Sequence, residues 1–146
     1  SLSNIFTPLY KLIIIWYNPT MKIHIIPRNQ TNSVESAWNL KQIYIRYFKS
    51  QSVEFIETDF YLDVKDESMK YLLDSEWGIH RFKTMGHQAD VSVYKDNDEP
   101  ATNPDVIRIY DFFKGTVRDN RCPRKIFSLK NILEGDLQAL LAEVFT

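Results

Sequence analysis

The chain has 146 residues, of which 44% are apolar and 25% are charged. This composition is typical of one globular domain and excludes a fibrous or disordered chain. Folding should bury about two-thirds of the unfolded surface at this size, so the core requires neither disulfides nor structural metal. Eighteen lysines and arginines nearly balance nineteen acids, which excludes a uniformly basic nucleic-acid coat and a strongly acidic chain. With only four glycines, glycine-rich phosphate loops are nearly excluded too.

The first twenty residues contain a strongly apolar run, LYKLIIIWY, at positions 9–17. A helix that spans a membrane needs about 20 apolar residues, so this run is too short. Asn18-Pro19-Thr20 ends it in a turn, and residues 1–8 provide neither the basic leader nor the cleavage site of a secretory signal. We expect a buried strand at 9–17 and interpret residues 1–20 as an N-terminal extension, with Met21 as a candidate natural start.

From Met21 onward the pattern alternates between strands and helices. Residues 21–26 alternate as a strand does, and Pro27 closes it. Apolar residues at spacings of three and four predict an amphipathic helix from Val34 to Phe48, capped by Asn32 or Ser33. The remaining predicted elements are a strand at 53–61, a short helix at 68–75, a strand at 91–94, an exposed linker at 96–103, a strand at 107–113, and one or two helices within 131–144. Because these elements lack regular βαβ alternation, they predict an α+β fold with a mixed β-sheet packed against helices.

Seven apolar residues of this pattern are predicted to share one core that joins the early helix to the carboxyl-terminal elements. They are Trp38, Tyr44, Phe48, Tyr110, Phe112, Leu129 and Leu133.

Charge is distributed unevenly along the chain. Residues 54–76 carry eight acids against two bases, a net charge of −6, and residues 105–130 carry seven bases against three acids, a net charge of +4. The acids alternate with apolar residues, and we interpret them as a solvated sheet face. The basic segment is interleaved with aromatic residues, a combination that binds phosphates and stacks on bases in nucleic-acid-binding proteins. The alternative is a solvated basic face over core aromatics.

Three segments resemble a known family. Residues 108–121, RIYDFFKGTVRDNR, resemble the Arg-Thr-Tyr-Asn-Phe-Pro-Gln-x-Arg-Val-Thr-Asp-His-Arg signature of bacterial and organellar class I peptide chain release factors. Residues 127–137, FSLKNILEGDL, are similar to the Tyr-Lys-Leu-Asp-Glu-Val-Leu-Asp-Gly-Asp-Leu segment of that family. Residues 75–81, SEWGIHR, are similar to its Glu-x-Gly-Val-His-Arg stretch. The resemblance covers residues 21–144 in the family's order, and it implies the fold of the codon-recognition core.

The departures from the family bear on function. In release factors, a domain with the Gly-Gly-Gln motif of peptidyl-tRNA hydrolysis precedes the Arg-Thr-Tyr signature, but residues 95–106 leave only twelve positions for it. The loop that carries the stop-codon tripeptide is reduced to residues 82–86, and this loop contains no such tripeptide. The resemblance therefore implies a core without hydrolase activity, and we do not expect stop-codon reading. Gly86-His87-Gln88 resembles Gly-Gly-Gln, but its position differs, and we interpret it as a coincidence.

We therefore expect a single release-factor-like domain at 21–146, formed by the blocks 21–95 and 105–146 and a short linker. The leading hypothesis is that this cytoplasmic protein binds the ribosome or structured RNA and modulates termination. The alternative is a degenerate paralogue that dimerises through residues 9–17 and has no RNA role. The candidate RNA-binding residues are Arg81, Arg108, Lys114, Arg118, Arg121 and Arg124.

An enzyme with a new site is the weakest hypothesis. The spacing of the three histidines and the single cysteine supports neither a zinc site nor a Cys-His nucleophilic pair. His80 matches a family position that braces the fold, and we expect His24 to be a packed or edge residue of its strand. The sequence therefore predicts no catalytic residue, metal ligand or cofactor, and no membrane partner.

Overall fold

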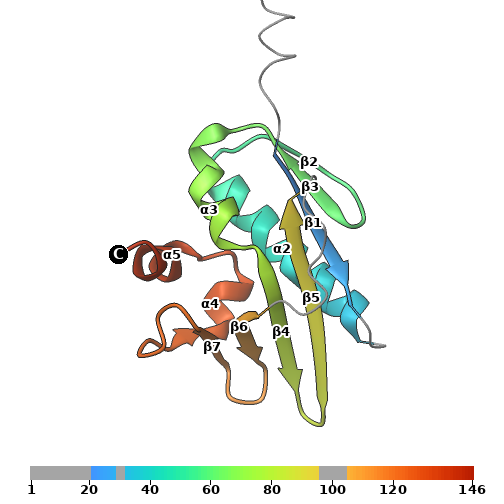
Figure 1. The fold of residues 1–146 in the computed structure, drawn as a ribbon, viewed down its shortest axis with the longest axis vertical. Helices are drawn as coiled ribbons and strands as arrows, with labels where there is room; N and C mark the ends of the chain where they lie inside the picture. Colours follow the sequence, from blue (N-terminus) through green and yellow to red (C-terminus); the bar gives the residue numbers. More distant parts are fainter. Residues whose placement is uncertain (1–20, 29–31, 96–104) are drawn as a thin grey trace, which may run out of the picture.

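A mixed β-sheet forms the framework of the molecule (Figure 1). The computed structural model describes residues 21–28, 32–95 and 105–146. Eight strands of the described residues join in the order β2-β3-β1-β5-β4-β6-β7-β8. Neighbouring strands are antiparallel except β4 and β6, which are parallel. The strands are β1 (Met21–Pro27), β2 (Phe55–Glu57), β3 (Tyr61–Val64), β4 (Gly78–Thr84), β5 (His87–Lys95), β6 (Val106–Asp111), β7 (Thr116–Asp119) and β8 (Phe127–Ser128).

Helices pack against this sheet, so the predicted α+β class is confirmed. The longest is α2 (Ser33–Ser50), which packs on β1 and β5. Its buried apolar residues recur at spacings of three and four, while Glu35 in its first turn and Lys49 in its last suit the helix dipole. Asn32 is the N-cap residue, although its side chain makes no capping hydrogen bond. The shorter helices are the 3₁₀ helix η1 (Glu67–Met69), α3 (Lys70–Ser75), α4 (Leu129–Leu133) and α5 (Gln138–Val144).

The predicted core is correct for most of its members. Tyr44, Phe48, Tyr110 and Leu129 are buried, and Leu133 packs against them partly buried. The prediction is wrong for two residues, because Trp38 is 54% exposed and Phe112 is 36% exposed. The Trp38 ring covers the ammonium group of Lys41, which lies 4.4 Å from the ring centroid. Phe112 lies just beyond the end of β6.

Three predicted strands differ from the structure. The segment 53–61 turns back on itself, because Thr58 Oγ1 accepts a hydrogen bond from the Tyr61 amide at 3.2 Å and begins the hairpin of β2 and β3. The strand predicted at 91–94 is the end of the longer β5, whose partner β4 was not predicted. The strand predicted at 107–113 ends at Asp111. The Oδ1 atom of Asp111 accepts hydrogen bonds from the amides of Phe113 and Lys114, which form the turn.

Residues 1–20 and 96–104 lie outside the described residues. The predicted extension, the strand at 9–17 with its proposed dimer contact, and the linker at 96–103 therefore stay predictions. In the described part of the chain, no helix combines the length and apolar character needed to cross a bilayer.

Candidate nucleic-acid interface

A buried ionic network lies beneath the predicted site, and Arg108 is at its centre. The Arg108 side chain has no exposed surface. Its guanidinium donates two hydrogen bonds to the Glu76 carboxylate, at 2.8 and 2.6 Å, and a third to Asp119 Oδ2 at 3.2 Å. Both carboxylates are also inaccessible to solvent. Pairing of this kind is what permits charged groups to lie in a protein interior.

Tyr110 and His80 extend the network. Arg108 donates to the Tyr110 hydroxyl at 3.2 Å, and that hydroxyl lies 3.0 Å from His80 Nδ1. His80 Nε2 lies 2.9 Å from the Glu76 carbonyl, which can only accept, so Nε2 carries the proton and Nδ1 accepts from Tyr110. Burial, followed by the charge of Arg108, lowers the pKa of His80 to about 4. The imidazole is therefore neutral near pH 7, which keeps this chain of hydrogen bonds intact.

Arg121 closes the network from its surface side. Its Nε and Nη2 donate to the two oxygens of Asp119 at 2.8 and 2.6 Å, and its Nη1 donates to the Ser75 carbonyl. Burial by itself would raise the pKa of Asp119, but hydrogen bonds from Arg121 and the charge of Arg108 hold it below its ordinary value. Two guanidiniums thus face two carboxylates, and the network has no net charge.

The network links the two sequence blocks. Glu76 and His80 come from the first block, whereas Arg108, Asp119 and Arg121 come from the second. The interpretation of all acids at 54–76 as solvated is therefore wrong for Glu76, which is fully buried. The expected bracing role of His80 agrees with its complete burial and its two hydrogen bonds.

Half of the predicted RNA-binding side chains are occupied by acidic partners. A side chain with no exposed surface cannot contact an RNA phosphate, so Arg108 is removed from the predicted surface. Arg121 is 29% exposed, but the network holds its guanidinium against Asp119. Arg81 donates to both oxygens of Asp90, at 2.9 and 3.0 Å, across the pair of β4 and β5.

The other three predicted residues form what we call the basic edge: Lys114, Arg118 and Arg124. All three are exposed, and none has an ion-pair partner among the residues that the structure describes. Arg118 lies on β7, and the other two lie in the turns before and after that strand. With the network set aside, residues 105–130 present five bases against two acids, a net charge of +3.

The acidic segment lies at the other side of the sheet. Its strands β2 and β3 form one end of the strand order, and β7 and β8 form the other. We call the outermost of these strands, β2, with its exposed acids Glu54, Glu57 and Asp59, the acidic edge. The nearly neutral chain is therefore electrically polarised across its sheet.

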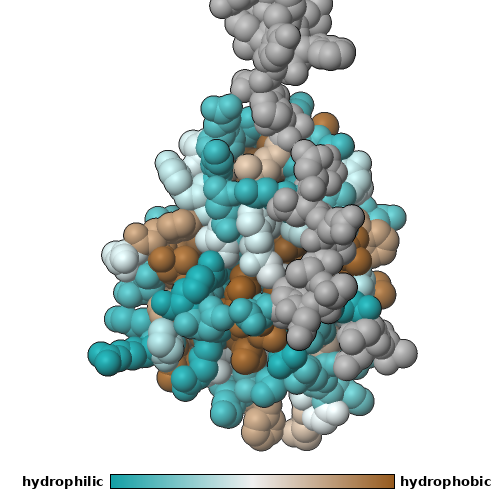
Figure 2. Space-filling view, viewed as in Figure 1, coloured by the Kyte–Doolittle hydropathy of each residue, from teal (hydrophilic) through white to brown (hydrophobic). Residues whose placement is uncertain are grey.

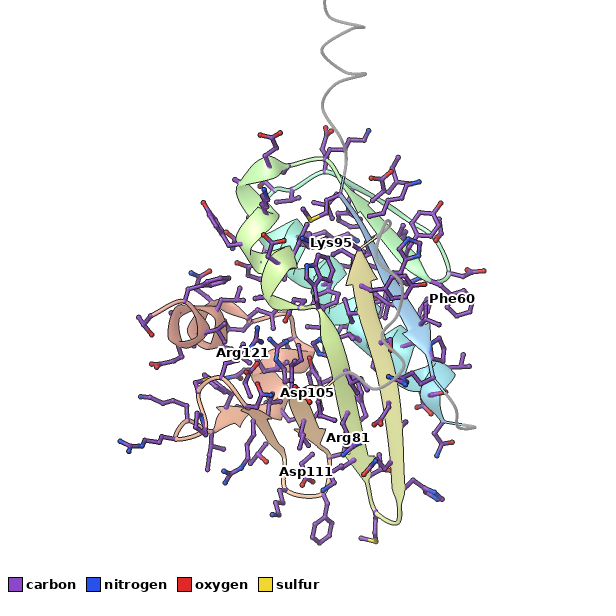
Figure 3. All side chains as sticks on the ribbon, viewed as in Figure 1. Phe60, Arg81, Lys95, Asp105, Asp111 and Arg121 are labelled. Atoms are coloured by element: carbon purple, nitrogen blue, oxygen red, sulfur yellow. The ribbon has the colours of Figure 1, made fainter. Side chains whose placement is uncertain are left out.

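Two hairpin turns lie side by side at the lower end of the molecule in Figure 3. The Phe112 amide of the β6–β7 turn donates to the Lys83 carbonyl of β4 at 2.8 Å. Met85 in the β4–β5 turn is 76% exposed and Phe113 in the β6–β7 turn is 70% exposed; Figure 2 shows apolar residues projecting at this end. A shallow hollow of about 260 Å³ separates the turns, between Lys83 and Asp111.

A second hollow, of about 200 Å³, lies next to these turns. Phe82, Ala89 and Phe112 provide its apolar part. The start of α2 adds the polar side chains of Asn32, Glu35, Ser36 and Asn39, and the β4–β5 hairpin adds Thr84 and His87. Aromatic and amide groups therefore line a space that is open to solvent beside the two turns.

The sequence matches no family model, and no curated protein matches it. The solved structure of RF2 of Thermus thermophilus superposes on the chain with a TM-score of 0.67. The match covers 87% of this chain and 67% of that chain, at 14% sequence identity. The chain has a release-factor-like fold. At this identity the likeness shows the fold alone, and that fold is the one implied by the three motifs.

The Gly-His-Gln stretch, His24 and Cys122 are the other residues that the sequence singled out, and each belongs to the framework of the fold. Gly86, with a φ of +77°, forms the β4–β5 turn, and His87 and Gln88 begin β5, so the Gly-His-Gln stretch belongs to a hairpin. The His24 ring stacks on Tyr94, with 4.9 Å between centroids. Burial and the nearby Asp119 raise the pKa of Cys122. Within the described ranges, no group of three His, Cys, Asp or Glu residues could hold a metal ion.

Proposed function

We propose that the protein binds the ribosome or structured RNA through the basic edge and the two adjacent hairpin turns. The observation that carries this proposal is the exposure of Lys114, Arg118 and Arg124 without acidic partners among the described residues. Arginine forks onto two phosphate oxygens at once, and unpaired guanidiniums are free to do so. A solvated basic face without a partner would place the same charges on the surface, so the distinction requires a binding experiment.

The hairpin turns support the same proposal. Met85 and Phe113 expose apolar surface beside Lys83 and Lys114. Bases stack on aromatic side chains with a gain of about 1–3 kcal/mol per base, while lysines attract the backbone phosphates. Large apolar residues that project next to lysines thus suit unpaired nucleotides in a folded RNA.

The fold suggests the ribosome as the source of that RNA, and the modulation of termination as the role. The 146 residues contain no Gly-Gly-Gln sequence, and the interval at 95–106 is too short for the family's hydrolase domain. We therefore propose that the protein is not an enzyme. Purified protein should release no peptide from a ribosome paused at a stop codon, and release above a control without any factor would contradict this part of the proposal.

Ribosome binding is tested by co-sedimentation of the tagged protein over a series of salt concentrations. Affinity should fall by about 0.7 to 0.9 log units per log unit of salt for each phosphate contact. The double variant Arg118→Glu, Arg124→Glu should bind at least about tenfold more weakly and show a smaller salt slope, because two contacts are lost. Arg121 is not a suitable position, because a glutamate there would face Asp119.

The matched control is Lys49→Glu, Lys65→Glu, which makes the same change in charge at exposed residues away from the basic edge. It should bind as the parent protein does, apart from a small effect of total charge. Equal binding by parent and Arg118→Glu, Arg124→Glu proteins, or binding that does not depend on salt, would contradict the proposal. Thermal unfolding of all three proteins checks that the fold is intact.

A further inference from the structure

The acidic edge has backbone hydrogen-bonding groups that no strand of the described residues uses. In the strand order of the described residues, β2 is outermost and has β3 as its neighbour on one side. The Lys65 amide donates to the Glu54 carbonyl at 3.3 Å, and the Thr58 amide donates to the Tyr61 carbonyl at 2.9 Å. Bonded and non-bonded residues alternate along an antiparallel pair. The N–H and C=O groups of Phe55 and Glu57 therefore point away from β3.

Apolar surface accompanies these groups. Ile56 is 50% exposed, and Phe60, in the turn that follows, is 44% exposed. Phe60 projects from the side of the molecule in Figure 3. A strand laid along β2 would cover Ile56.

The charge of the acidic edge determines which kind of strand can pair with β2. Residues 54–60 contain three acids and no base, so this edge repels a polyanion. A second copy of the chain paired antiparallel, with Phe55 of each strand opposite Glu57 of the other, would bring the two Glu57 side chains to diagonal positions about 7–8 Å apart. A parallel pair in register would set like acids directly opposite one another, which is unfavourable. Short charged edges of this type resist pairing with themselves, whereas a basic segment would neutralise the acids.

We propose that the acidic edge binds an extended basic peptide of a partner protein as an additional strand. Side chains of paired strands stand opposite one another. The incoming peptide thus places basic residues opposite Glu54 and Glu57, and apolar residues opposite Phe55 and Ile56. The recognised pattern is basic-apolar-apolar-basic, and it is the same in either strand direction. Main-chain hydrogen bonds supply affinity in this mode of binding, and the side chains supply specificity.

The inference does not rest on the proposed RNA function. The acidic edge and the basic edge lie at opposite ends of the strand order, so one can be occupied while the other is free. A protein that binds RNA through the basic edge would still present β2 to a protein partner.

The test uses the full chain and a fluorescein-labelled peptide, Thr-Lys-Val-Val-Lys-Thr, with fluorescence anisotropy as the readout. The peptide Thr-Glu-Val-Val-Glu-Thr is the control and should bind at least about tenfold more weakly, because its charges face Glu54 and Glu57. When the lysine peptide saturates the protein, the amide protons of Phe55 and Glu57 should become protected from hydrogen exchange. Equal binding of the two peptides, or unchanged exchange at both amides, would overturn the proposal.

Two variants at Glu57 distinguish the contribution of its backbone hydrogen bond from that of its charge. Glu57→Pro removes an outward N–H without breaking a bond to β3, a position where edge strands tolerate proline. It should weaken the lysine peptide further than Glu57→Gln does, by about fivefold, the loss expected for one backbone hydrogen bond. Thermal unfolding reports whether the proline variant is folded, and the exchange experiment on the parent protein decides if it is not. Two results would refute the peptide proposal. One is equal affinity of the folded Glu57→Pro and Glu57→Gln variants for the lysine peptide. The other is sedimentation of the parent protein as a dimer, if Glu57→Pro abolishes that dimer. Ribosome co-sedimentation should be the same for both variants.

Discussion

The buried network makes a quantitative prediction for Arg108→Met, a substitution that keeps an unbranched apolar stem and removes the charged guanidinium. Four hydrogen bonds are lost: two to Glu76, one to Asp119 and one to the Tyr110 hydroxyl. Asp119 keeps its bonds from Arg121, but the Glu76 carboxylate loses both of the donors that Arg108 supplies. The variant therefore leaves the buried charge of Glu76 without its cationic partner.

The expected cost follows from that charge. Removing one partner of a buried ion pair costs about 3–5 kcal/mol, because the remaining ion keeps its desolvation penalty. Domains are stable by only about 5–15 kcal/mol, so this loss is a large part of the total. At about 3 °C per kcal/mol for a chain of this length, the unfolding temperature should fall by about 10 °C. The double variant Arg108→Met, Glu76→Leu should recover at least half of the loss, since apolar replacements of buried ion pairs are often neutral.

Urea unfolding followed by tryptophan fluorescence measures these free energies. The matched control is Arg81→Met, since Arg81 makes a similar two-pronged pair with Asp90 but is 28% exposed. Its loss should cost about 0–1 kcal/mol, as surface pairs do. Equal costs for Arg108→Met and Arg81→Met would refute the reasoning, as would a double variant no more stable than Arg108→Met.

Two further predictions concern His80 and two glycines. The pKa of His80 is about 4 in the folded state and about 6.5 in the unfolded chain. Between these two pH values the unfolded chain binds more protons than the folded protein, so the free energy of unfolding should fall as the pH is lowered from about 6.5 to about 4. His80→Gln should lose this part of the pH dependence, which unfolding free energies at several pH values would reveal; identical profiles would contradict it. Gly135→Ala would place a Cβ 2.5 Å from Arg46 Cβ at a φ of +91°, and it should lower the free energy of unfolding by at least about 2 kcal/mol. Gly86 has a φ of +77° but no neighbouring atom within 4 Å of the added Cβ, so Gly86→Ala should lower it by about 1 kcal/mol. Equal losses on thermal unfolding would contradict the packing argument.

The elements with strong periodicity could be predicted from the sequence. Apolar residues alternate along β1 and recur at spacings of three and four along α2, because these residues face the core. Both elements were therefore predicted within a few residues of their observed ends. The turn between β2 and β3 was missed, because Thr58 and Asp59 interrupt an apolar pattern without a glycine or proline. Strand β4 was missed because its apolar residues Ile79 and Phe82 are three positions apart and do not alternate, and because its pairing with β6 involves residues far apart in the chain.

The candidate site could be predicted only in part, since a count of charges cannot separate exposed bases from buried ones. Arg108 is 32 residues from Glu76, and only the paired strands bring them together. The spacing of Arg108 and Tyr110 on one strand does place both on one face, but charged residues are so seldom buried that the sequence favoured the surface. The prediction for Lys114, Arg118 and Arg124 rested on the same count, and the structure leaves these three exposed.

The separation of the two charged edges has a consequence for how the molecule approaches a polyanion. The net charge of −1 would by itself produce a weak repulsion at long range. Opposite charges at the two ends of the sheet instead form an electric dipole, and a negative field exerts a torque on it before any contact forms. The protein would arrive already turned, with β8 leading and β2 trailing. Orientation in advance of collision raises the fraction of productive encounters, and salt, which shortens the reach of the field to about 8 Å under physiological conditions, removes that advantage.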